Sequence, residues 1–162
     1  MLLVATATAQ RPADFSGRWI LTPDAAAPSG ARAVPTMGSG WGPDVSISQD
    51  PASLTIEFTP YVRGDMQPPT RLVYRLDGTE SKNVVNVGRG PQDQVCTAAW
   101  DGTRLTLTTV RSFTAAAGEK PMRIQTTQTL SLESPTTLVV ETTHGAALGG
   151  QPSTSRSIYK KN

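Results

Sequence analysis

The sequence predicts an all-β protein folded as a single antiparallel up-and-down barrel of about eight to ten strands, with a two-sheet β-sandwich as the alternative. Composition is the first observation behind this prediction: the 162 residues include 22 Thr and 13 Ser but only four Lys and five Glu. Threonine favours strands, whereas lysine and glutamate favour helices. The second observation is that short runs of alternating apolar and polar residues follow one another along the chain, separated by turn sequences.

This pattern identifies the strands in chain order, beginning with residues 16–21. The next stretch, residues 23–43, is rich in Ala, Pro and Gly and has no periodicity, so it is expected to form one long loop. Residues 45–48 and 54–58 then alternate apolar and polar side chains on either side of an Asp-Pro turn. This arrangement predicts a hairpin.

The rest of the chain is predicted to form consecutive hairpins. Two Asp-Gly pairs and one Ser-Pro pair supply the backbone conformations that tight turns need. The strands that they separate are residues 71–76, 82–87, 94–100, 105–109, 122–132, 138–143 and 154–160. Sequential hairpins form an antiparallel meander, and a long meander tends to close into a barrel because closure removes unpaired edges.

Charge and residue content exclude several classes of partner and cofactor. The net charge is +2 and the basic residues are scattered, which predicts no nucleic-acid partner. No apolar run approaches the roughly 20 residues that cross a bilayer, so no transmembrane segment is expected. Cys96 is the only cysteine and lies in an apolar run, where we expect it to be buried and unreactive. With one cysteine and one histidine, the sequence predicts no metal site and no cofactor.

The N-terminal segment has features of an export signal. Its residues are apolar and small, and Ala7-Thr8-Ala9 fits the pattern that precedes a signal-peptidase site. We expect residues 1–10 to be a signal-peptide remnant or a disordered N-terminus, and residues 11–162 to form the barrel domain. The expected location is the periplasm or the exterior of a bacterial cell.

Candidate catalytic groups are few, and no catalytic residue is predicted. The glycine-rich residues 38–42 lack the spacing of a nucleophile elbow. His144 stands beside Gly145 and is expected to be a solvated loop residue. Glu57 and Glu141 alternate with apolar neighbours, which places both carboxylates on the outer face rather than facing each other as a glycosidase requires.

Polar residues predicted on the inner face are more informative. If Leu130 and Leu132 face the core, the two-residue period of a strand carries Gln128 inward as well. The polar residues that this parity places inside are Tyr74, Thr109, Arg111, Thr126, Gln128 and Thr142. A buried polar group without a partner costs about 1–3 kcal/mol. The pattern therefore indicates a cavity for a ligand, with a solid core of mutually hydrogen-bonded side chains as the alternative.

The predicted ligand is a small apolar or amphipathic molecule. Its expected contacts are Tyr74, Arg111 and Gln128 inside the cavity, with Trp41 and Tyr61 as aromatic surface at the mouth.

Residues Phe15 to Leu21 resemble the G-x-W opening strand of lipocalins and lipocalin-like bacterial domains. The whole chain is also similar to a group of uncharacterised exported bacterial proteins that begin with F-x-G-x-W and repeat a strand-Asp-Gly-strand unit. The resemblance implies a barrel whose floor is closed by the tryptophan, with an arginine of the last strand packed across it. The floor residues implied for this chain are Gly17, Trp19 and Arg156, the last of which shares the parity of Ile158.

Three functions are compatible with the sequence. The first is an exported barrel that binds a small molecule without a cofactor. The second is an envelope interaction module with a packed core, whose loop at residues 23–43 contacts a protein. The third is an isomerase or cyclase that uses the cavity to shape its substrate, for which Tyr74 or His144 would transfer a proton.

Overall fold

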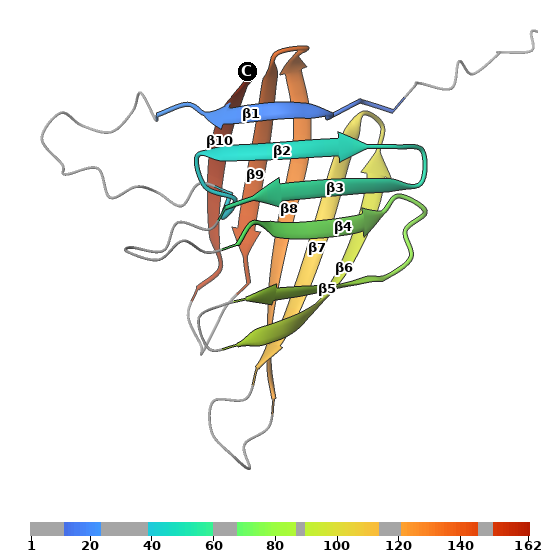
Figure 1. Cartoon of the computed structure of the whole chain (residues 1–162), viewed down its shortest axis with the longest axis vertical. Helices are drawn as coiled ribbons and strands as arrows, with labels where there is room; N and C mark the ends of the chain where they lie inside the picture. Colours follow the sequence, from blue (N-terminus) through green and yellow to red (C-terminus); the bar gives the residue numbers. More distant parts are fainter. Residues whose placement is uncertain (1–11, 24–38, 60–67, 87–89, 114–120, 146–150) are drawn as a thin grey trace, which may run out of the picture.

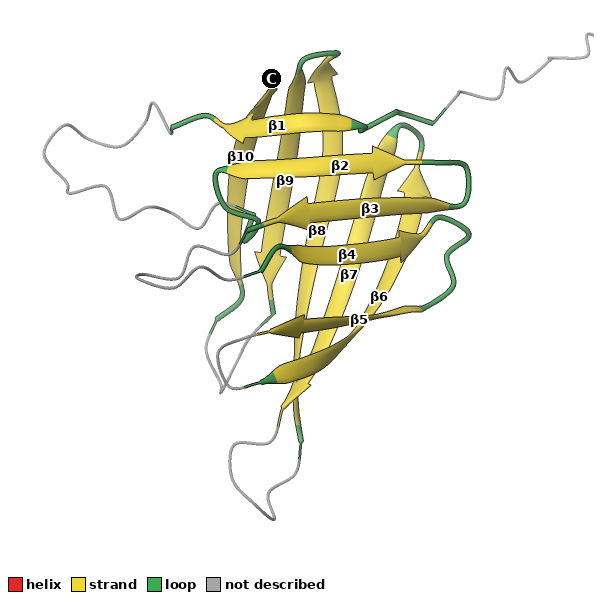
Figure 2. Cartoon of the chain, viewed as in Figure 1, coloured by secondary structure: helices red, strands yellow, loops and turns green. Residues whose placement is uncertain are grey.

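The computed structural model describes residues 12–23, 39–59, 68–86, 90–113, 121–145 and 151–162, and every regular element in these ranges is a β-strand (Figure 2). The strands are β1 (Gly17–Leu21), β2 (Asp44–Gln49), β3 (Ser53–Phe58), β4 (Thr70–Arg75), β5 (Ser81–Asn86), β6 (Pro91–Asp101), β7 (Arg104–Phe113), β8 (Met122–Ser134), β9 (Thr137–His144) and β10 (Ser153–Lys161). Each overlaps one of the predicted strands. The predicted all-β class is therefore confirmed.

The ten strands form a single antiparallel sheet in the order β4-β3-β2-β1-β10-β9-β8-β7-β6-β5. Hydrogen bonds between β1 and β10 join the first strand to the last, with Trp19 opposite Lys161. In Figure 1, β1 to β4 cross in front of the long strands β6 to β10 at a steep angle, so that the sheet wraps around an interior. The sheet is a nearly closed up-and-down barrel, as predicted, with its seam between β4 and β5.

Side chains rather than a backbone ladder hold this seam at its middle. The Asn83 Oδ1 accepts a hydrogen bond from the Val73 N–H at 2.8 Å, and the Asn83 Nδ2 donates to the Val73 carbonyl at 2.9 Å. The Ser81 hydroxyl donates to the same carbonyl at 2.6 Å. Asn83 is buried. Its amide therefore acts as a substitute peptide group that satisfies both polar atoms of Val73.

The inner face is apolar toward one end of the barrel and polar toward the other. The apolar end buries Trp19 and Tyr159 completely, and Phe15 stacks on Trp100 with ring centroids 6.0 Å apart. Aliphatic side chains that are at most 2% exposed surround them: Val45, Ile47, Leu54, Ile56, Leu105, Leu107, Leu130, Leu138 and Val140. Burial of this continuous apolar surface is the main stabilising contribution to the fold.

The floor of the barrel contains Trp19, as the resemblance implies, but its cationic partner is different. The indole Nε1 donates to the Phe15 carbonyl at 2.9 Å, and the Lys161 ammonium lies 5.3 Å from the centroid of the Trp19 ring. Arg156 does not pack across Trp19. It is exposed on the outer face and pairs with Glu133, because Tyr159 rather than Ile158 points inward and sets the parity of β10.

Gly17 lets the Lys161 side chain lie close to the backbone of β1 at this floor. Its φ is +146°, and a Cβ added there would lie 2.5 Å from Cε of Lys161. Glycine therefore accommodates both the backbone conformation and the lysine side chain that covers Trp19.

Threonines cover much of the outer face of β6 to β10. One row joins residues that lie directly opposite one another on consecutive strands: Thr97, Thr108, Thr127, Thr143 and Thr154. In the neighbouring row, the hydroxyls of Thr106 and Thr129 are 3.3 Å apart. Cross-strand pairs of β-branched residues stabilise a sheet and tolerate water, which accounts for much of the threonine content.

Candidate functional site

The polar end of the barrel interior is the candidate site. Strand register brings its side chains together across five neighbouring strands. Gln94 is opposite Arg111. Thr126 is opposite Thr109 on one side and His144 on the other, and Thr142 is opposite both Gln128 and Ser155. We define the polar end by these inward residues of β6 to β10. The two-residue period predicted five of these inward residues, namely Thr109, Arg111, Thr126, Gln128 and Thr142, but not Gln94, His144 or Ser155.

Exposure of the inward side chains rises across the polar end. Gln128 and Thr142 are 4% and 0% exposed. Ser155, directly opposite Thr142 on β10, is exposed, and so are His144 and Ser153 at the next inward positions of β9 and β10. The inward side chains beside the start of β10 are therefore accessible to solvent, and they lie next to the buried Gln128 and Thr142.

The base of the polar end is a hydrogen-bonded group built around Ser39. The Gln128 Nε2 donates to the Ser39 carbonyl at 2.6 Å, and the Ser39 hydroxyl lies 2.7 Å from the Tyr159 hydroxyl. Tyr159 also donates to the Gly42 carbonyl at 3.1 Å. This group separates the polar end from the packed apolar end.

Trp41 belongs to the core and not to the mouth. It is 2% exposed, and its ring centroid is 6.5 Å from that of Tyr159. The expectation that Trp41 supplies aromatic surface at the mouth is therefore wrong, because its apolar ring gains more from burial beside Tyr159 than from exposure. Tyr61, the other residue expected there, lies outside the described residues.

Thr142 is the unusual residue of the polar end. Its side chain is fully buried, and among the described residues its Oγ1 is the buried side-chain oxygen or nitrogen without a hydrogen-bond partner. Gln128, directly opposite on β8, directs its amide nitrogen to Ser39 instead. A hydroxyl group that could bond a bound molecule is therefore held at the inner limit of the polar end.

Tyr74 lies on β4, across the barrel interior from Thr109 of β7, and its side chain is completely buried. Its hydroxyl is 3.0 Å from the Thr109 hydroxyl, which is in turn 3.7 Å from Sγ of Cys96. Cys96 is completely buried, as expected from its apolar run. Burial raises the pKa of Tyr74 well above its ordinary value, so the phenol stays protonated at neutral pH and can act only as a hydrogen-bonding group.

This environment predicts the behaviour of two tyrosines at high pH. Burial is the main cause that raises the pKa of both Tyr74 and Tyr159, with hydrogen bonds to Thr109 and Ser39 opposing the rise. Because the folded pKa values are raised, the neutral phenols contribute stability that is full below the unfolded pKa of about 10 and is lost as pH rises through the folded values.

We therefore expect phenolate absorbance to show that Tyr74 and Tyr159 ionise only as the protein unfolds at high pH. The Tyr74→Phe and Tyr159→Phe variants would assign the signals. Reversible ionisation of both residues near pH 10 in the folded protein would contradict the buried placement.

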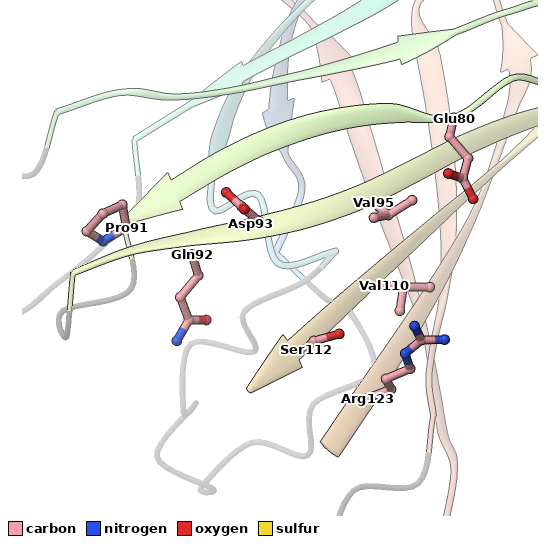
Figure 3. Close-up of a pocket in the computed structure, with 8 residues that line it drawn as sticks. All are labelled: Glu80, Pro91, Gln92, Asp93, Val95, Val110, Ser112 and Arg123. Atoms are coloured by element: carbon pink, nitrogen blue, oxygen red, sulfur yellow. The ribbon is translucent and has the colours of Figure 1, made fainter. Parts of the chain in front are cut away.

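Open hollows lie on the outer surface of the described strands. The larger, of about 620 Å³, lies over β6, β7 and β8. Figure 3 shows Val95 and Val110 between Glu80 and the Arg123 guanidinium. The smaller, of about 420 Å³, lies against β1 to β3 near the ion pair of Arg18 and Asp44. Both have mixed charge and face away from the polar end.

The remaining predicted groups lie apart from the polar end. Glu57 and Glu141 are exposed on the outer face, as predicted, where they pair with Arg71 and Arg104. Across the described ranges, no three His, Cys, Asp or Glu side chains come together as a metal-binding group. The described ranges also hold no helix with the length and apolarity to cross a bilayer.

No protein-family model matches the sequence, and no curated protein matches it either. The geometry of the polar end therefore carries the functional argument.

Proposed function

We propose that this protein binds a small amphipathic molecule in the polar end of its barrel. The observation that carries the proposal is the buried Thr142 hydroxyl without a partner, which lies opposite the exposed Ser155 and one inward position from the exposed His144. An unpartnered buried hydroxyl costs about 1–3 kcal/mol, and a bound molecule that hydrogen-bonds to it would recover that cost. The neighbouring amides and hydroxyls offer further donors and acceptors to the same molecule.

The packed apolar end supports an alternative, the interaction module with a filled core. That end is closely packed, because it buries Trp19, Trp41 and Tyr159. The two functions differ in what they require of the polar end, since only a binding protein needs it to accept a molecule.

Native mass spectrometry of the purified chain, followed by extraction and analysis of released small molecules, distinguishes these functions. We expect a stoichiometric amphipathic compound to leave with the denatured protein. A clean mass of the chain alone, together with no binding of amphipathic probes, would favour the interaction module.

A substitution at Thr142 separates stability from binding. The Thr142→Val change replaces the unpartnered hydroxyl with a methyl of similar size, so we expect the free energy of unfolding of the ligand-free protein to rise by about 1 kcal/mol. Ligand affinity should fall, because the methyl cannot hydrogen-bond. Urea unfolding and a binding titration measure the two effects.

Thr143→Val is the matched control. Thr143 is the next residue on β9 but lies on the outer face, where its hydroxyl is 3.1 Å from that of Thr154. We expect this change to leave ligand affinity unaltered. Equal affinity in the two variants would argue against a ligand at Thr142.

Lipocalin-like membership and export to the bacterial periplasm or exterior are also part of the proposal. The Lys161 ammonium over Trp19 supports the first, since a cation of the last strand covers the tryptophan of the opening strand. The Ala7-Thr8-Ala9 pattern supports the second, although it lies outside the described residues. Mass spectrometry of the protein from its own cells tests export: a mature N-terminus at Gln10 in the exported fraction supports it, and retention of Met1 in the cytosol contradicts it.

A further inference from the structure

Arg111 is a cation that faces the barrel interior. It shares the inward parity of Thr109 on β7, lies opposite Gln94 and Ile124, and is half-buried. Among the described residues, no carboxylate oxygen lies within 4.0 Å of its guanidinium.

Other arginines in the described strands behave differently. Those on the outer face that pair with a carboxylate are Arg18, Arg71, Arg75, Arg104 and Arg156. Each of them is exposed, so its charge is also solvated by water. Arg111 has less water around it than these residues and no described counter-charge.

No acidic side chain of the described strands faces the interior to balance the charge of Arg111. Asp44 points outward to Arg18. The other acidic residues on the described strands are all exposed: Glu57, Asp93, Asp101, Glu133 and Glu141. The inner face therefore carries a positive charge that the described interior leaves unmatched. A partly desolvated charge is costly unless a group of opposite sign approaches it.

We propose that the molecule held in the polar end is an organic anion whose acidic group binds the guanidinium of Arg111. This inference rests on the proposed function and specifies its ligand class. A guanidinium binds a carboxylate, sulfonate or phosphate through two parallel N–H donors. Gln94, directly opposite on β6, offers an amide donor to the same group, and Ile124 on β8 offers apolar surface to the body of the ligand.

Two fluorescent probes that share one ring system test the inference. Anilinonaphthalene sulfonate is an amphipathic anion, and N-phenylnaphthylamine is the same ring system without the sulfonate. We expect the wild-type protein to bind the anionic probe about tenfold more tightly than the neutral one. We also expect that preference to weaken as salt is added.

Three variants locate the effect. Arg111→Gln should lower the affinity for the sulfonate about tenfold and leave the neutral probe unchanged, whereas Arg111→Lys should retain part of the preference. Arg123→Gln is the matched control, because Arg123 lies on the next strand but faces the outer hollow. This control should change neither affinity, and thermal melting of each variant checks that it is folded.

The outcomes separate this inference from the proposed function. Equal binding of both probes, with no loss in Arg111→Gln, would overturn the anion inference while leaving a binding barrel. If Arg123→Gln lost anion binding and Arg111→Gln did not, the anion would bind in the outer hollow. That result would overturn the inference. Failure of both probes to bind the folded wild-type protein would overturn the inference and the proposed function together.

Discussion

Replacing Trp19 with alanine is expected to lower the free energy of unfolding by about 3–5 kcal/mol, the range seen when large buried aromatic side chains are truncated. Trp19 has no exposed surface and donates to the Phe15 carbonyl at 2.9 Å. The substitution leaves a cavity at the apolar end and an unpaired carbonyl, and it removes the ring beneath Lys161.

Urea unfolding followed by circular dichroism measures this effect. Ile20→Ala is the matched control, because Ile20 is the next residue on β1 but is 36% exposed on the outer face. We expect that control to change stability by no more than about 0.5 kcal/mol. Similar losses for the two variants would contradict the placement of Trp19 at the floor of the barrel.

Replacing Asn83 with leucine is expected to open the seam between β4 and β5. The Val73 N–H would lose its acceptor, and the Val73 carbonyl would keep only Ser81 as a donor. Because leucine buries these groups without pairing them, we expect the free energy of unfolding to fall by about 2–3 kcal/mol.

Hydrogen exchange at Val73 gives the most specific measurement of this effect. Its amide should be protected in the wild-type protein and exchange much faster in the Asn83→Leu variant. Asn86→Leu is the control, since Asn86 lies on the same strand but is exposed. Unchanged protection of Val73 in the Asn83 variant would show that another contact closes the barrel.

Much of the fold is predictable because local rules determine it. Alternation identified every strand, and the Asp-Gly pairs marked two of the tight turns, where Gly78 and Gly102 have φ values of +81° and +60°. These conformations suit glycine regardless of the rest of the molecule. Parity on β8 likewise placed Gln128 inside, because the leucines on that strand occur at alternate positions only.

Parity failed on β10 because adjacent residues there are both apolar. Ile158 and Tyr159 each suit an inner position, and the structure places Tyr159 inside, where its hydroxyl reaches Ser39 and Gly42. Arg156 consequently faces outward. Residues 39–41 form turns, as predicted for the loop at residues 23–43, but a stretch without periodicity gives no sign that Trp41 is buried.

The seam could not be predicted from the sequence at all. The bonds of Asn83 to Val73 depend on how two strands approach across a barrel, and a single asparagine in a strand has no pattern that reveals such a partner. The unpartnered Thr142 hydroxyl is similar, because parity placed Thr142 inside but only the packing around it shows that its Oγ1 has no partner.

Binding within the polar end is tested most directly by observing its threonine methyl groups. In a protein labelled at threonine methyls, titration with anilinonaphthalene sulfonate should shift the NMR signals of Thr126 and Thr142. Their chain neighbours Thr127 and Thr143 face outward and serve as internal references. We expect saturable shifts at Thr126 and Thr142 with little change at Thr127 and Thr143. Shifts confined to the outward threonines, or none at saturating probe, would contradict a ligand site inside the barrel.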